Sequence, residues 1–246
     1  MLTDEAIARR LNEMAQQKDP SDSLWPENCA GSRLALVIFV GPSPGGNKED
    51  KRRPIKLSCN KPLWNEPYVD PLNWSRGFQT SFGPFVEAII GKPYEKTAKL
   101  IARFNMDWLG NPESRDVSYR YMWEGCSHML PVLYECNPEL VIPMDEKTFG
   151  VLQIALYNAG YEILPAQIGE VKVKISDKDG KTRSHSGIMA FSAQKEERAF
   201  VVIKSLQHPA RIYDAEYAKR IGWAIREAAM CMEEGKPVNL EDDCGM

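Results

Sequence analysis

The sequence predicts an α/β fold, a three-layer α/β/α sandwich around a central, mainly parallel, four-stranded sheet. Residues 34–40 are seven consecutive apolar residues, and an unbroken apolar run of this length is typical of a strand buried on both faces. Segments with helical periodicity alternate with short apolar runs along the rest of the 246-residue chain. Strands and helices in alternation form a parallel sheet that helices cover on both faces.

Each element is predicted from its own local signals. Thr3 or Asp4 can cap an N-terminal helix, and Asp145 and Asp214 can cap two later helices. Pro131 is expected to kink or divide the helix that contains it. The strands expected after the first are residues 100–106, 138–144 and 199–204, the helices are 85–90, 113–136, 146–160 and 214–235, and alternation around an Asp-Gly turn predicts a β-hairpin over 170–191.

The chain is expected to contain one folded domain. Residues 1–33 are expected to form the N-terminal helix and a lead-in loop, 34–235 the α/β domain, and 236–246 a loose C-terminal tail. The N-terminal segment has mixed charge and a helical pattern, unlike a signal or transit peptide. No apolar run approaches the roughly 20 residues that cross a bilayer. We therefore expect a cytoplasmic protein that does not interact with membranes.

The six cysteines are widely separated, and the sequence contains no C-x-x-C pair. A disulfide framework is not expected in a chain of this size and compartment. A zinc site needs closely spaced ligands, which these cysteines do not provide. The sequence therefore predicts no metal site.

A turn rich in glycine and proline, "GPSPGG", follows the first strand. It does not fit a phosphate-binding loop, because Asn47 stands where the P-loop needs lysine. Pro42 and Pro44 also lack the backbone amides that such a loop donates. The dinucleotide pattern fails as well, since Ser43 occupies the position of its second glycine. A rigid turn of this kind is better suited to a flat ligand, and Ser43 is its first polar side chain.

His208 is the histidine most suited to a functional role. It lies in the short loop "SLQHPAR" between an apolar strand and the last helix. Ligands of parallel α/β sheets bind beyond the carboxyl ends of the strands. A histidine there can hydrogen-bond a ligand atom on which charge develops.

The G-x-x-P-G turn at Gly41–Gly45, together with "HPA" at 208–210, resembles the uracil-DNA glycosylase superfamily. In order and spacing the resemblance also includes "FNMDWLGNPES" and "CSHMLPVLYECNPELVIPM", and it extends over roughly residues 34–225. The resemblance implies a four-stranded parallel sheet with a DNA groove across its strand ends. It also implies an enzyme that flips a damaged base out of DNA and hydrolyses its N-glycosidic bond, without a cofactor.

The same resemblance implies roles for individual residues. Gly41, Pro42 and Gly45 would contact the base and the DNA backbone, and Ser43 would take the place of the residue that orients the water. Asn105, or alternatively Asn111, would read the Watson–Crick edge of the base. His208 would stabilise the negative charge that grows on the uracil O2. One aromatic residue would stack on the base, the candidates being Trp64, Tyr68, Trp74 and Phe78.

DNA is the partner that the resemblance implies, and we expect a monomer. Arg211, Ile212 or Tyr213 could enter the space that the flipped base leaves in the duplex. A basic cluster after the turn could contact phosphates, namely Lys48, Lys51, Arg52, Arg53 and Lys56. The net charge of −3 gives no overall signature of a nucleic-acid-binding protein.

The chain departs from the family at the residues that orient water. Many members have an acid or amide where this chain has Pro42 and Ser43, and many have glycine where it has Pro143-Met144. Serine is a weak general base without a partner. Two alternatives therefore remain open: a protein of the same fold that binds nucleic acid or a nucleotide without hydrolysis, and an unrelated α/β enzyme that acts on a small molecule.

Overall fold

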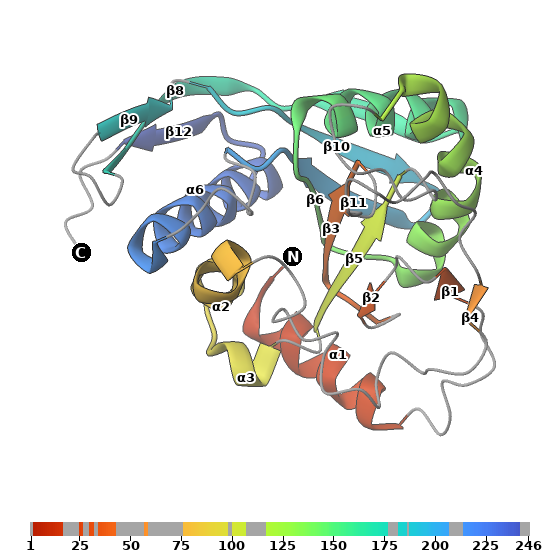
Figure 1. Ribbon diagram of the computed structural model, residues 1–246, viewed down its shortest axis with the longest axis horizontal. Helices are drawn as coiled ribbons and strands as arrows, with labels where there is room; N and C mark the ends of the chain where they lie inside the picture. The colour runs from red at the N-terminus through yellow and green to blue at the C-terminus, as the bar shows by residue number, and fades with distance from the viewer. Residues whose placement is uncertain are drawn as a thin grey trace.

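The fold is that of a computed structural model, shown in Figure 1. It describes residues 2–16, 25–26, 30–31, 34–42, 57–58, 76–97, 100–106, 117–176, 182–185, 187–206 and 214–241.

The main sheet has seven strands rather than the four expected from the sequence. Its spatial order is β2 (Ala30–Gly31), β5 (Ile101–Asn105), β3 (Val37–Gly41), β6 (Leu140–Pro143), β11 (Arg198–Ile203), β10 (Ala190–Lys195) and β7 (Glu162–Pro165). The four neighbours β5, β3, β6 and β11 are parallel, as predicted. The additional strands pair antiparallel at the two edges, and β2 contributes only two residues.

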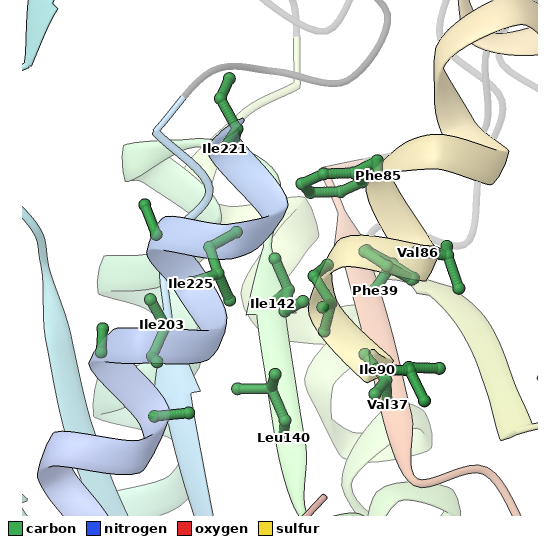
Figure 2. Close-up of a cluster of buried hydrophobic side chains, with 14 of the residues drawn as sticks. Val37, Phe39, Phe85, Val86, Ile90, Leu140, Ile142, Ile203, Ile221 and Ile225 are labelled. Carbon is green, nitrogen blue, oxygen red and sulfur yellow. The ribbon is translucent and has the colours of Figure 1, made fainter. Parts of the chain in front are cut away.

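Helices cover both faces of this sheet, which gives the three layers (Figure 1). On one face, Phe39 and Ile142 pack with α1 (Asp4–Gln16), α2 (Arg76–Ile90) and α6 (Ala215–Glu233). Figure 2 shows this cluster between the strands and helices α2 and α6. On the other face, Ile38 and Val141 pack with α4 (Tyr119–Cys136) and α5 (Glu146–Asn158). A short helix, α3 (Tyr94–Thr97), follows α2.

A second, three-stranded sheet consists of β8 (Ile168–Ser176), β9 (Thr182–His185) and β12 (Val238–Glu241). The predicted hairpin is present in part, because β8 and β9 pair antiparallel, but Ala190 and Phe191 at the end of the predicted range belong to β10 of the main sheet. The C-terminal segment was expected to be loose, but β12 pairs parallel with β8, and Val238 is buried in the same cluster as α6. Burial of apolar side chains therefore fixes this part of the tail. Two further strands of two residues each, β1 (Trp25–Pro26) and β4 (Leu57–Ser58), pair to form a separate sheet.

Two helices differ from the prediction, and each of them contains a proline. Helix α2 begins at Arg76 rather than near residue 85, and it continues through Pro84. Helix α4 begins after the N-cap Ser118 and is not divided at Pro131. Proline removes one backbone hydrogen bond, but buried side chains on both sides of it can keep a helix packed. Phe82 and Phe85 are such side chains in α2.

The predicted caps of α5 and α6 are confirmed. Asp145 accepts a hydrogen bond of 2.7 Å from the Thr148 amide, and Asp214 accepts one of 2.9 Å from the Tyr217 amide. Within the described part of the chain, no helix is both long and apolar enough to span a membrane.

Replacing Gly222 with alanine tests the packing of α2 against α6. A Cβ atom at Gly222 of α6 would lie 2.5 Å from the Phe85 carbonyl oxygen and 2.8 Å from Ala88 Cβ. We expect Gly222→Ala to destabilise the protein by about 1–3 kcal/mol, because the two helices must separate. Gly150→Ala is the control, since a Cβ there meets no described atom within 4 Å.

The control is expected to have the opposite sign. Alanine is a better helix former than glycine, so Gly150→Ala should stabilise the protein by about 0.5–1 kcal/mol. Urea unfolding of the two variants measures both effects. Equal effects at the two positions would contradict the close approach of α2 and α6.

The Cys126 thiol is buried in α4, and burial raises its pKa to about 12. An unfolded thiol ionises near pH 8.5. Because the folded pKa is the higher one, stability that the neutral thiol contributes is present below about pH 8.5 and is lost as the pH rises towards 12. We expect Cys126 to resist alkylation in the native protein and to react in urea, as measured by peptide mass spectrometry. Rapid native alkylation would contradict this burial.

Candidate functional site

The carboxyl ends of the four parallel strands meet at one edge of the main sheet. The order β5-β3-β6-β11 corresponds to second, first, third and fourth along the chain, so the direction of winding reverses next to β3. Ligands of open α/β sheets bind where the strand order reverses, outside the carboxyl ends of the strands. This places the candidate site where Gly41 ends β3 and Pro143 ends β6.

Gly41 and Asn105 lie side by side at this edge. They are register partners in the β3–β5 ladder, and the Met106 amide donates a 2.9 Å hydrogen bond to the Gly41 carbonyl oxygen. A Cβ atom at Gly41 would lie only 2.6 Å from Asn105 Oδ1. The absence of a side chain at Gly41 is therefore what leaves room for the Asn105 amide. Asn105 is 4% exposed, so this amide is one of the few buried polar groups of the sheet.

The end of β6 completes the same surface. The Met144 amide donates a 2.9 Å hydrogen bond to the Val40 carbonyl oxygen, and Met144 Sδ would lie 3.8 Å from a Cβ at Gly41. Met144 packs in the cluster on the α2 and α6 face. Because side chains alternate along a strand, Asn105 and Gly41 face the same side as Ile101 and Phe39 of that cluster.

The loop with His208 begins at this edge as well. The Ser205 amide donates a 2.9 Å hydrogen bond to the Pro143 carbonyl oxygen, two residues after β11 ends. Ser205 is 2% exposed. Sequence reasoning did not single it out, although a polar residue directly after a buried apolar strand is a usable signal. Met144 was noted only as a departure from the family, and its contact with the Gly41–Asn105 pair was missed.

Several of the predicted site residues lie outside the described residues. They are Ser43, Gly45, Lys48, Lys51, Arg52, Arg53, Lys56, Asn111, His208 and Arg211, with the aromatic candidates Trp64, Tyr68 and Trp74. Phe78 falls within α2. Gly41, Pro42 and Asn105 are the predicted residues that the described edge brings together, and Pro42 is buried.

The described residues offer no group of three or more histidine, cysteine or acidic side chains that could bind a metal ion. Asp145 directly follows Met144, but its Oδ1 accepts the Thr148 amide as the cap of α5.

The fold and this edge define an α/β protein with a candidate ligand site at the carboxyl ends of its parallel strands. Neither protein-family models nor curated protein sequences give a match to the chain. A more specific function must therefore be inferred from the residues of the chain itself.

Proposed function

We propose that this protein is a DNA glycosylase-type enzyme of base-excision repair, which hydrolyses the N-glycosidic bond of uracil or another deaminated base. The observation that supports the proposal is the arrangement at the carboxyl edge. Gly41 and Asn105 are in contact there, and the loop that leads to His208 starts at Ser205 on the same edge. These residues come from three of the four segments that carry the resemblance to uracil-DNA glycosylases.

The proposed chemistry needs few groups. Asn105 reads the Watson–Crick edge of a base flipped into the site, because an amide presents both a donor and an acceptor. Water adds to C1′ of the deoxyribose as the bond to the base breaks, the bonding electrons leave with the base, and the proton that the water loses ends on the released base. His208 stabilises the negative charge on the departing base, and Ser43 orients the water. No cofactor takes part.

DNA is the proposed partner, bound by a cytoplasmic monomer. Phosphate contacts come from the basic residues after the turn, Lys48, Lys51, Arg52 and Arg53, and from Arg211 in the His208 loop.

Release of free base from oligonucleotides tests this function. The substrates are single- and double-stranded DNAs that contain one uracil, xanthine or hypoxanthine, each incubated with the enzyme in excess. We expect release from at least one of them. If every substrate stays intact, the glycosylase proposal is wrong.

The second candidate function is binding of nucleic acid or a nucleotide without hydrolysis. It is favoured by Pro42, which is buried at the turn and has no carboxylate with which to orient a water. Binding to DNA that weakens with salt, with no base released, would support this function over the first. Absence of binding to both DNA and free nucleotides, even at low salt, would contradict both candidates and favour an enzyme that acts on another small molecule.

A further inference from the structure

Two exposed aromatic side chains lie one helical turn apart at the start of α4. Tyr119 is 64% exposed and Trp123 is 44% exposed, whereas the core clusters bury most of the large apolar side chains that the structure describes. Residues four apart lie on the same side of a helix, so the two rings form one surface. The inner side of α4 is anchored by buried Met122 and Cys126, which keeps this pair facing outward.

The aromatic pair is at the same edge of the sheet as the candidate site. Helix α4 returns the chain from the carboxyl end of β5 to the start of β6, so its first turn lies at the carboxyl edge. Lys147 in the first turn of α5 connects the two helices, since its Nζ donates to the Val117 carbonyl oxygen. The same Nζ lies 4.7 Å from the centre of the Tyr119 ring. Helix α5 in turn starts just after Met144, which packs beside Gly41.

Among the described residues, the charged side chains near the rings nearly balance, with two positive and three negative. Arg120 forms an ion pair of 2.8 Å with Glu124, and Lys147 is next to the acidic Glu146 and the cap Asp145. Attraction of phosphates therefore contributes little here. Flat aromatic rings instead stack on nucleotide bases whatever their sequence.

The kind of apolar residue favours bases over a protein partner. None of the exposed large aliphatic side chains among the described residues belongs to α4; they are Ile154, Leu164, Ile168, Met189 and Met230. Protein interfaces need a continuous apolar core, which two isolated rings with charged neighbours do not provide.

We propose that Tyr119 and Trp123 form a stacking surface for unpaired bases that flank the nucleotide bound at the Gly41–Asn105 edge. This inference deepens the proposed function and rests on it. The protein would then bind DNA in which the bases beside the damaged one are unstacked, and single-stranded DNA is the simplest such partner.

Binding of single-stranded DNA to the full chain tests the stacking surface. The probe is a fluorescein-labelled oligothymidylate of about 12 nucleotides, followed by fluorescence anisotropy. We expect Tyr119→Ala and Trp123→Ala each to weaken binding roughly tenfold. The phenylalanine replacements Tyr119→Phe and Trp123→Phe should retain most of the affinity, because a ring still stacks.

Salt dependence separates stacking from a general loss of charge. Since the surface around the rings is nearly neutral, the alanine variants should lose affinity for the oligonucleotide by the same factor at low and at high salt. Oligothymidylate should also quench the fluorescence of Trp123, and Trp123→Phe should remove that part of the quenching. The control is Ile154→Ala/Tyr157→Ala, which removes an exposed apolar pair farther along α5 and should leave the affinity unchanged.

The inference and the proposed function can fail separately. If the double variant Tyr119→Ala/Trp123→Ala binds the oligonucleotide as wild type does, the stacking surface is wrong, even when uracil is excised. If the rings are needed for binding but no base is released, the stacking surface is supported and the proposed glycosylase activity is wrong. A change in oligomeric state of the double variant in sedimentation velocity would show that the rings contact protein, which would overturn the inference.

Discussion

Alanine at position 41 is expected to lower the proposed base excision about a hundredfold, nearly as much as alanine at position 105. The reason is steric. The new Cβ would lie 2.6 Å from Asn105 Oδ1, which is closer than any normal contact, so the buried amide must move. A displacement of about 1 Å at a group that positions the substrate can cost a hundredfold in rate. Single-turnover release of uracil, with enzyme in excess, measures the effect.

Combining the two changes makes this prediction more specific. Because Gly41→Ala and Asn105→Ala disturb the same amide, the double variant should lose little more activity than either single variant. Gly150→Ala is the matched control, since the same substitution meets no described neighbour within 4 Å. Full activity of Gly41→Ala would contradict a role for the Gly41–Asn105 contact, and independent losses would indicate that the residues act separately.

Replacing His208 with alanine is expected to slow excision about a hundredfold to a thousandfold. The hydrogen bond from the Ser205 amide to the Pro143 carbonyl oxygen fixes the start of this loop beside the Gly41–Asn105 pair. The lost interaction is made with charge that develops only as the bond breaks. The rate at saturating enzyme should therefore fall, while the affinity for DNA stays close to that of wild type.

Two further variants make the His208 result interpretable. His208→Asn retains a hydrogen-bond donor and should recover part of the rate. His128 is exposed on α4, and His128→Ala should leave the rate unchanged. A His208→Ala protein with wild-type rate would remove the proposed electrostatic role, even if the protein is a glycosylase.

The central parallel strands and the capped helices could be predicted because their signals are local. The apolar run at 34–40 corresponds to β3, which the structure places at Val37–Gly41. Asp145 and Asp214 cap the helices that were expected to follow them. The edge strands could not be predicted in the same way. Segment 182–185 pairs with β8 as the Asp-Gly turn predicts, but segment 190–195, whose first residues were assigned to the same hairpin, pairs with β11 in the main sheet.

The candidate site could be predicted only in part, for a similar reason. The sequence predicts that Gly41 follows one apolar strand and that Asn105 lies at the end of another, so a common edge was expected. Their direct contact depends on β5 and β3 being neighbours, and that strand order is a property of the whole sheet. Ser205 and Met144 reach the edge through backbone hydrogen bonds between strands, for which no local residue pattern is specific.

The small sheet has a consequence for the order in which the chain folds. Strand β12 pairs with β8, and the Glu170 amide donates a 2.9 Å hydrogen bond to Asn239 Oδ1 across 69 positions of the sequence. Contacts so distant along the chain form late, because a long loop must close before they contribute. During synthesis on the ribosome, β8 and β9 therefore lack their partner β12 until residue 241 has been added. The core around α6 is therefore completed only after residue 241 has been synthesised.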